Sequence, residues 1–187
     1  MPRPADPSLP SRILAAAHAL WTEGGEAAVT MRDVAARAST TTPSVYAHFE
    51  DRMAIMRGVR KLARGRLEAS LAKSTSFLDG CRRMLDFADA HPRDYELLFG
   101  YGYRERAEDA VLEAEFEGFE AHISQSGVAE RNVRPTALAV ASLLHGASMF
   151  RLAHKTAGAL WRERRKATLD ACELLIEHRR SKRAARS

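Results

Sequence analysis

The segment from Thr30 to Arg52 constrains the fold of this chain more than any other. It reads TMRDVAARASTTTPSVYAHFEDR and contains two stretches with helical signals, separated by a turn at residues 39–40. Thr30 precedes the first stretch and Thr41 precedes the second, and a threonine hydroxyl in that position caps the free amides of a helix. Pro43 falls in a first turn, where a missing N–H is tolerated. The segment therefore predicts two short helices joined by a tight turn.

The second of these helices needs a packed support, because its expected span, residues 42–48, is too short to be stable alone. Val45 and Phe49 lie four residues apart and anchor it. The expected support is a helix that begins near residues 8–11 and ends at Gly24, with an apolar face formed by Ile13, Leu14, Ala17, Leu20 and Trp21. Such a unit, with small hydroxyl side chains on the outer face of its last helix, is typical of proteins that read the major groove of DNA.

The basic excess of the chain lies in the same region. The net charge is +5, and residues 1–66 hold ten Lys and Arg against six Asp and Glu, a net of +4. The rest of the chain contributes only +1. A basic N-terminal module is typical of polyanion-binding proteins, although a helix face in contact with water often has the same composition.

The N-terminal part resembles the DNA-binding domain of TetR-type transcriptional regulators over about residues 10–56. The resemblance implies a homodimer whose third helix reads an operator, and a larger helical C-terminal domain that dimerises and usually holds an inducer. It rests on turn length and on these motifs: Arg12-Ile13-Leu14-x-Ala16-Ala17, Leu20, Glu23-Gly24, Thr30-Met31-Arg32-Asp33-Val34-Ala35-x-x-Ala38, Val45-Tyr46-x-His48-Phe49 and Arg52.

The resemblance also implies which residues contact DNA. The threonines and the serine at the start of the third helix fall where such proteins contact bases or adjacent phosphates, and Tyr46 and His48 fall where they contact the backbone. Arg52 stands where the family usually has Lys, and a cation beside helix N-terminal amides would form a phosphate site. The expected DNA-binding residues are Thr30, Arg32, Thr40, Thr41, Thr42, Ser44, Tyr46, His48 and Arg52.

Two departures from the family pattern bear on this interface. Ser39 occupies the turn position where Gly is usual, and a positive φ there would cost serine about 1 kcal/mol. The third helix has no Arg, Asn or Gln for a bidentate contact to a base, so Arg32 on the second helix is the remaining candidate. Specificity is therefore expected to be modest or to depend partly on DNA shape.

The remainder of the chain predicts further helices, over residues 52–74, 77–90, 93–99, 103–125, 132–155 and 162–180. We therefore expect an all-α chain of about nine helices. The expected parts are a disordered tail (1–7), a helix-turn-helix DNA-binding domain (8–52), a C-terminal helical ligand-binding and dimerisation domain (53–180) and a basic tail (181–187). The helix over 132–155 is apolar nearly all round, which indicates burial on more than one side. It and the final helix are expected to form a four-helix bundle across a two-fold axis.

An inducer site is expected in the C-terminal part. The run His-Pro-Arg-Asp-Tyr-Glu-Leu-Leu-Phe at residues 91–99 and the run Leu144-His145-Gly146 resemble one TetR C-terminal subfamily with a Trp-His-Gly motif, here without the Trp. His145 suits either pocket lining or a satisfied position in the core. The candidate ligand-binding residues are Phe99, Tyr103, Phe116, His145 and Met149.

No catalytic, metal-binding or cofactor-binding pattern is expected in this sequence. It has no phosphate-binding glycine loop, nucleophile elbow or paired carboxylates, and no histidine pair has metal-ligand spacing. Cys81 and Cys172 match no ligand spacing and suit reduced structural thiols in a cytoplasmic protein. His18 suits either the surface or helix–helix packing. The low-charge run from Val133 to Phe150 is short of a membrane span, and no secretory signal is expected.

Two functions remain open on this sequence. The first is a ligand-responsive transcriptional repressor that binds a palindromic operator as a homodimer and responds to a small-molecule inducer of unknown identity. The second is an all-helical small-molecule-binding or interaction protein whose DNA affinity is weak and non-specific. The second function is motivated by Ser39 in the turn and by the outer face of the third helix, which has hydroxyls but no Arg, Asn or Gln.

Overall fold

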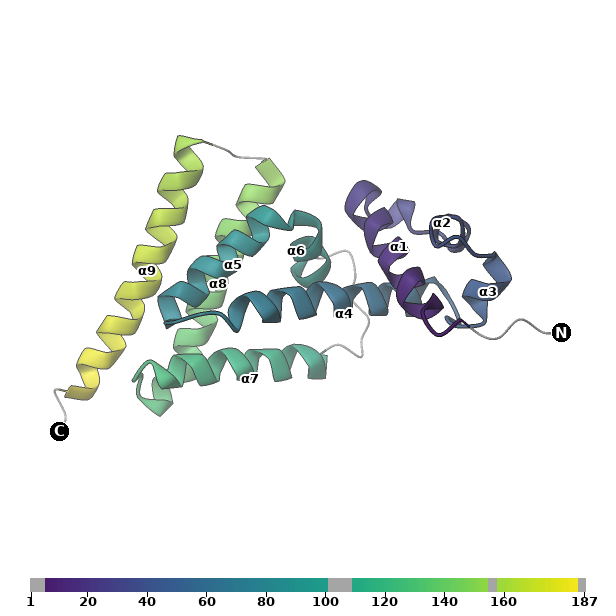
Figure 1. The fold of residues 1–187 in the computed structure, drawn as a ribbon. Helices are drawn as coiled ribbons and strands as arrows, with labels where there is room; N and C mark the ends of the chain where they lie inside the picture. Colours follow the sequence, from purple (N-terminus) through teal and green to yellow (C-terminus); the bar gives the residue numbers. More distant parts are fainter. Residues whose placement is uncertain (1–5, 101–108, 155–157, 185–187) are drawn as a thin grey trace. The chain divides into compact units, whose positions relative to one another are not determined.

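The computed structural model describes residues 6–100, 109–154 and 158–184 (Figure 1). These ranges form nine α-helices and one short 3-10 helix, η1 at Glu26–Ala28, and they include no strand. The all-α prediction with about nine helices is confirmed. Contacts divide the chain into unit 1, which is Met1–Arg66 with Arg93–Leu98, and unit 2, which is Leu67–Pro92 with Phe99–Ser187.

Unit 1 is built on α1 (Leu9–Gly24), α2 (Met31–Arg37), α3 (Thr42–Tyr46), the start of α4 (Arg52–Leu71) and most of α6 (Pro92–Phe99). Ile13, Val34 and Val45 from the first three helices are each fully buried. α2 packs on both α1 and α3. The two short helices α2 and α3 would be unstable alone, so tertiary contacts stabilise them.

A glycine in α4 marks where α1 passes close by. A Cβ placed on Gly58 would lie 2.4 Å from Leu14 Cδ2. A glycine inside a helix costs about 1 kcal/mol relative to Ala, but at this position a larger residue would require the Leu14 side chain to move. The same helix contributes Ile55, Met56 and Val59 to the core of unit 1, and all three are fully buried.

The division of the chain differs from the boundary at residue 52 that the sequence suggested. α4 packs with unit 1 as far as Arg66, and residues 93–98 cluster with unit 1 although Pro92 and Phe99 on either side cluster with unit 2. Sequence periodicity assigns helices but not the unit to which each belongs, because it contains no information about long-range packing.

Unit 2 contains α5 (Phe77–Ala90), α7 (Asp109–Gln125), α8 (Glu130–His154) and α9 (Ala159–Ala184). α8 packs against the other three, and α5 also packs against α9. One core is formed by Cys81, Leu85, Val140, Leu144, Ala147, Trp161 and Cys172, and a second by Ile123, Val128, Ala137 and Ile176. α8 and α9 begin two to three residues before their expected starts, which is the ordinary uncertainty of helix ends.

The two cysteines meet in the first of these cores. Both are free thiols, and both are almost fully buried. A side-chain hydrogen bond with Cys172, together with burial, raises the pKa of the Cys81 thiol, so that thiol stays protonated. A protonated, buried thiol packs as a small apolar side chain, which is consistent with two structural thiols.

α8 has the length and composition of a membrane-spanning helix, with a mean hydropathy of 1.3 over its most apolar window. This differs from the expectation that the run is too short to span. α8 packs against α5, α7 and α9, and 33% of that window is buried.

Candidate nucleic-acid interface

The two short helices begin at the caps that the sequence predicts. Thr30 Oγ1 accepts a hydrogen bond from the Asp33 amide at 3.1 Å and donates one to Asp33 Oδ2 at 2.6 Å. Thr41 Oγ1 accepts one from the Ser44 amide at 3.3 Å and lies 2.9 Å from Ser44 Oγ. Each cap satisfies an amide that the first helical turn leaves free, which fixes where α2 and α3 start.

The turn between α2 and α3 contains a strained serine. Ser39 has a φ of 53°, the only positive value at a residue other than glycine in the part of the chain that the structure describes. The Ser39 amide donates to Ala36 O at 3.2 Å and the Thr40 amide donates to Ala35 O at 3.0 Å, which is the Schellman arrangement. Arg12 of α1 donates to Ala38 O at 3.3 Å and so ties α1 to the end of α2.

The expected DNA-binding residues lie on or beside α2, α3 and the start of α4, with different exposures. Tyr46 is 54% exposed and is the large apolar side chain that this surface presents to solvent. Thr30, Arg32, Thr41 and His48 are also exposed, whereas Thr40, Thr42, Ser44 and Arg52 are half-buried. The set therefore offers a neutral, hydroxyl-rich and aromatic surface, with Arg32 as its exposed cation.

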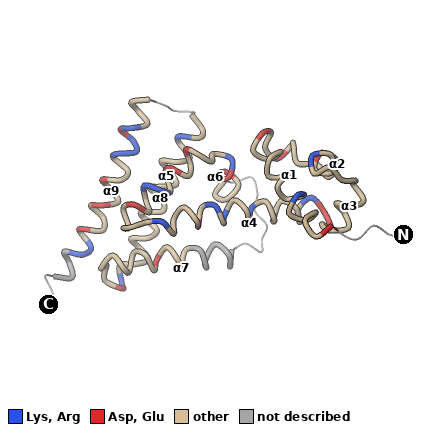
Figure 2. The backbone as a smooth tube through the Cα atoms, in the orientation of Figure 1, with Lys and Arg blue, Asp and Glu red and all other residues tan. Residues whose placement is uncertain are grey.

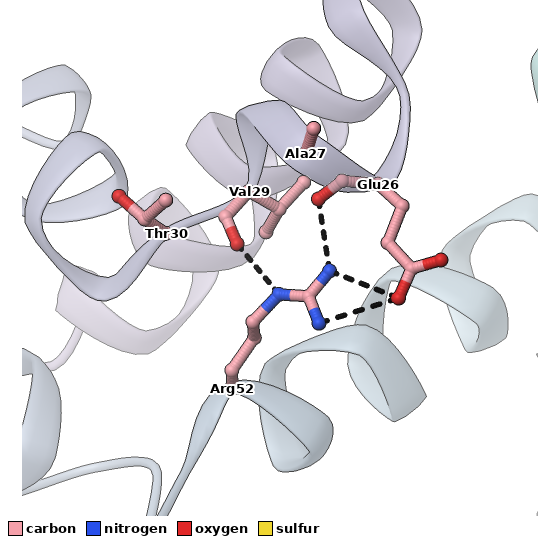
Figure 3. A pocket seen from close by; sticks show the side chains of 5 residues that line it. All are labelled: Glu26, Ala27, Val29, Thr30 and Arg52. Atoms are coloured by element: carbon pink, nitrogen blue, oxygen red, sulfur yellow. Dashed lines mark hydrogen bonds and ion pairs between the residues drawn. The ribbon is translucent and has the colours of Figure 1, made fainter.

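Arg52 makes contacts within unit 1 that the sequence does not reveal. Its Nε donates to Val29 O at 2.7 Å, and one terminal nitrogen donates to Glu26 O at 2.8 Å and to Glu26 Oε1 at 3.2 Å (Figure 3). The guanidinium lies in a shallow open hollow that Ala27 and Thr30 also line. Arg52 thus joins α4 to the segment before α2, and only part of the side chain remains available to a phosphate.

The start of α4 is capped by its own carboxylate. Asp51 Oδ1 accepts a hydrogen bond from the Ala54 amide at 2.6 Å. The Ala54 amide, one of the helix N-terminal amides expected to bind a phosphate, is therefore already hydrogen-bonded within the protein. Three cations farther along α4 are exposed, Arg57, Lys61 and Arg66, whereas Arg60 is buried. Figure 2 shows Lys and Arg positions recurring along this helix.

A buried carboxylate attaches α6 to the rest of unit 1. Asp94, whose side chain is 3% exposed, lies 2.6 Å from His18 Nε2 through Oδ1 and 3.2 Å from the Arg66 guanidinium through Oδ2. Burial alone would raise the pKa of Asp94, but the hydrogen bonds and charges of His18 and Arg66 outweigh it and lower that pKa. Trp21 Nε1 donates to Arg93 O at 2.9 Å beside this cluster.

The helix-packing interpretation of His18 is therefore the one that the structure supports. His18 is 9% exposed and its partner lies 76 residues away in the sequence. Sequence reasoning missed Asp94 because an acidic residue in the first turn of a helix is adequately explained by the helix dipole. No local signal distinguishes that role from a long-range ion pair.

The candidate ligand-binding residues are only partly brought together. Phe99 and His145 meet edge to face with ring centroids 6.3 Å apart, and burial lowers the pKa of His145, which favours a neutral imidazole. Phe116 packs instead with Phe119 and with Arg134. Met149 is half-buried on α8, and Tyr103 lies outside the described residues. Within the described ranges no group of three or more His, Cys, Asp or Glu is placed to hold a metal ion.

Comparison with known proteins agrees with this geometry. Residues 13–59 match the model of the bacterial regulatory proteins of the TetR family. No curated protein sequence matches the chain. The fold is shared with a protein of unknown function from Rhodococcus sp. RHA1, at 20% identity over 95% of this chain and 98% of that one, with a TM-score of 0.75.

Two further structures share the fold and carry a bound molecule. The multidrug binding protein EbrR, solved with imidazole, is 23% identical over 94% of each chain with a TM-score of 0.67. BioQ, solved with its natural double-stranded DNA operator, is 19% identical over 92% of this chain and 97% of that one, with a TM-score of 0.60. The match over residues 13–59 covers the helices that form the interface described above, so this part of the chain is similar to the bacterial regulatory proteins of the TetR family.

Proposed function

We propose that this protein is a ligand-responsive transcriptional repressor that binds a palindromic operator as a homodimer in the cytoplasm. The observation that carries the proposal is the capped α2–turn–α3 unit, held on α1 by Arg12 and by the buried residues Ile13, Val34 and Val45. A short, firmly supported helix with small side chains is what insertion into a major groove requires. The operator-bound relative BioQ has the same fold.

The dimer is assigned to α8 and α9. These helices pack on one another and carry Leu138, which is 51% exposed, and Leu174, which is 64% exposed. Exposed leucines on two adjacent helices that pack on one another are typical of an unpaired interface. A two-fold axis there would give a four-helix bundle and would bring two copies of α3 to one DNA duplex.

Dimerisation is tested by sedimentation. Leu174→Asp is expected to convert the dimer to monomer, because it places a charge in the centre of the bundle. Leu62→Asp on α4 is the matched control, since Leu62 is also exposed, at 40%, but lies in unit 1. A dimer that survives Leu174→Asp unchanged would contradict the assignment of the interface.

The regulatory mechanism is a population shift between two spacings of the reading helices. Two half-sites must lie about one DNA turn, roughly 34–36 Å, apart. A ligand that prefers another spacing lowers operator affinity by no more than its differential affinity for the two states. Phe99 and His145 mark the proposed ligand site, which is supported by their ring contact and by the imidazole-bound relative EbrR.

The second candidate is an all-helical ligand-binding or interaction protein with weak, non-specific DNA affinity. The strained turn at Ser39 and the lack of Arg, Asn or Gln on α3 favour it. The two candidate functions differ in whether the affinity for DNA depends on the base sequence of the duplex. A repressor discriminates strongly among duplexes, whereas a non-specific binder follows charge alone.

The experiment is DNA binding as a function of salt, measured by fluorescence anisotropy on wild type and three variants. Tyr46→Ala is expected to weaken binding to all sequences, and Thr42→Ala is expected to alter sequence preference. Arg52→Ala reports on phosphate contact, because losing one such contact reduces the slope of log affinity against log salt by about 1. An unchanged slope with weaker binding would assign Arg52 to the fold alone, through Val29 and Glu26.

A further inference from the structure

The two cysteines of the chain form a pair inside unit 2. Cys81 lies on α5 and Cys172 on α9, and these two helices pack against each other (Figure 1). Both thiols are free, only 2% of Cys81 and 0% of Cys172 is exposed, and the two side chains are hydrogen-bonded to each other. The sequence contains no other cysteine. Each thiol therefore has the other as its one possible partner within the chain.

The shared hydrogen bond makes the two sulfur atoms chemically unequal. The bond from the Cys81 thiol lowers the pKa of Cys172, although burial acts in the opposite direction. The same bond, together with burial, raises the pKa of Cys81. A lone buried thiol is inert, because its thiolate has no water to solvate it. At Cys172 the S–H group of Cys81 takes the place of that water, so Cys172 is the sulfur that ionises and Cys81 stays protonated beside it.

The surroundings of the pair limit which oxidants can reach it. The cysteines lie in an apolar core with Leu85, Val140, Leu144, Ala147 and Trp161. A large or charged oxidant would have to unfold this core. Hydrogen peroxide is small and neutral, and local openings of the fold are enough to admit it.

We propose that Cys81 and Cys172 are a reversible oxidation site that closes to an intramolecular disulfide on exposure to hydrogen peroxide. The Cys172 thiolate attacks one peroxide oxygen and the O–O bond breaks. The hydroxide that leaves takes up the proton that Cys172 released, which gives one water and a sulfenic acid on Cys172. The Cys81 sulfur then attacks the Cys172 sulfur, the S–O bond breaks, and the hydroxyl group leaves with the Cys81 proton as a second water.

The geometry favours closure of the bond. Disulfide sulfurs lie about 2 Å apart, and two sulfurs that already share a hydrogen bond need only a small approach of their helices to reach that distance. The disulfide would join α5 to α9 and restrict how far these helices can separate. Neither DNA nor a small-molecule ligand takes part, so the inference goes beyond the proposed function and does not depend on it.

The first test treats the folded, full-length protein with hydrogen peroxide and then blocks the remaining thiols in denaturant. Mass spectrometry should show the loss of both thiols, a chain lighter by two hydrogen atoms, and a peptide that contains Cys81 bonded to Cys172. A non-reducing gel should show a single chain, and dithiothreitol should restore both thiols. The rate of thiol loss should stay nearly constant at urea concentrations below the unfolding transition, because the reaction belongs to the folded state.

Variants test the role of the hydrogen bond. Cys81→Ser keeps a donor beside Cys172, whereas Cys81→Ala removes it. After peroxide treatment, dimedone added in denaturant should label Cys172 as a sulfenic acid more strongly in Cys81→Ser than in Cys81→Ala. Cys172→Ala is the matched control, and its Cys81 should remain unlabelled. Circular dichroism checks that the helices of each variant are intact.

The wild-type experiment decides the proposal even if a variant fails to fold. Two thiols that remain free in the folded protein would overturn it, and so would a disulfide between two chains. A rate of thiol loss that rises in proportion to the unfolded fraction would assign the reaction to the unfolded chain and overturn it as well. Equal labelling of Cys172 in folded Cys81→Ser and Cys81→Ala would contradict the role given to the hydrogen bond.

Discussion

Asp94 in unit 1 and Asp89 in unit 2 have similar bonding partners in different surroundings. Asp94 is 3% exposed and contacts His18 of α1 and Arg66 of α4. Asp89 is 28% exposed; it accepts from Arg151 Nε at 3.0 Å and from Trp161 Nε1 at 2.9 Å, joining α5 to α8 and α9. Water competes for the second carboxylate and hardly reaches the first. α6 is therefore held on unit 1 by a buried charge that is costly to leave unpaired, whereas the helices of unit 2 depend mainly on their apolar cores.

The largest effect is expected from Asp94→Ala. Removing the carboxylate leaves His18 buried without its partner and releases Arg66, whose half-exposed side chain recovers part of its hydration. The free energy of unfolding should fall by about 2–3 kcal/mol. Urea denaturation of both aspartate variants measures the difference, and equal losses for Asp94→Ala and Asp89→Ala would remove the distinction between the two sites.

The contribution of the buried Asp94 carboxylate to stability should depend on pH. Because the folded state lowers the pKa of Asp94 below its ordinary value of 3.8, the carboxylate contributes stability above that value and loses it as the pH falls through the lower folded pKa. The stability difference between wild type and Asp94→Asn should therefore be constant near neutral pH and shrink in acid, below about pH 4. A difference that grows as the pH falls would have the wrong sign.

Asp89→Ala is expected to cost less, about 1 kcal/mol, since a partly exposed ion pair contributes little and the lost bond to Trp161 accounts for most of the effect. Thermal unfolding of the two single variants and of the Asp89→Ala, Arg151→Ala double variant measures it. A coupling between Asp89 and Arg151 above about 2 kcal/mol would show that water does not screen this site.

The smallest effect concerns the turn before α3. Ser39→Gly should stabilise unit 1 by about 0.5–1 kcal/mol, because glycine adopts a positive φ without strain. Thr30→Ala, which removes the cap of α2, should destabilise it by about 1 kcal/mol and serves as the opposite reference in the same calorimetric series. If Ser39→Gly lowered the melting temperature, the strain assigned to Ser39 would be wrong.

The sequence predicts the parts of the interface that depend on local chemistry. The caps at Thr30 and Thr41 are predicted from hydroxyls that precede short helical runs, a signal that involves neighbouring residues only. For Ser39 the resemblance to the family indicates only that a positive φ would strain a serine where Gly is usual, and the structure shows that φ. The all-α fold followed from helical spacing in the same way.

Contacts between distant residues could not be predicted in this way. The pairs His18–Asp94 and Cys81–Cys172 join residues whose own surroundings are explained without them, and Arg52 has the composition of a phosphate ligand while bonding to Val29 and Glu26. A single sequence does not show which residues distant in the chain contact each other in the fold. For that reason the attachment of residues 93–98 to the DNA-binding unit came only from the structure.

The central claim is that the α2–turn–α3 unit reads DNA sequence. The most direct test is competition at physiological salt between the duplex upstream of the protein's own gene and a shuffled duplex of the same composition. The account predicts that wild type prefers its own upstream DNA by about a thousandfold or more. Equal affinity for the two duplexes would contradict it and would favour the non-specific, ligand-binding alternative.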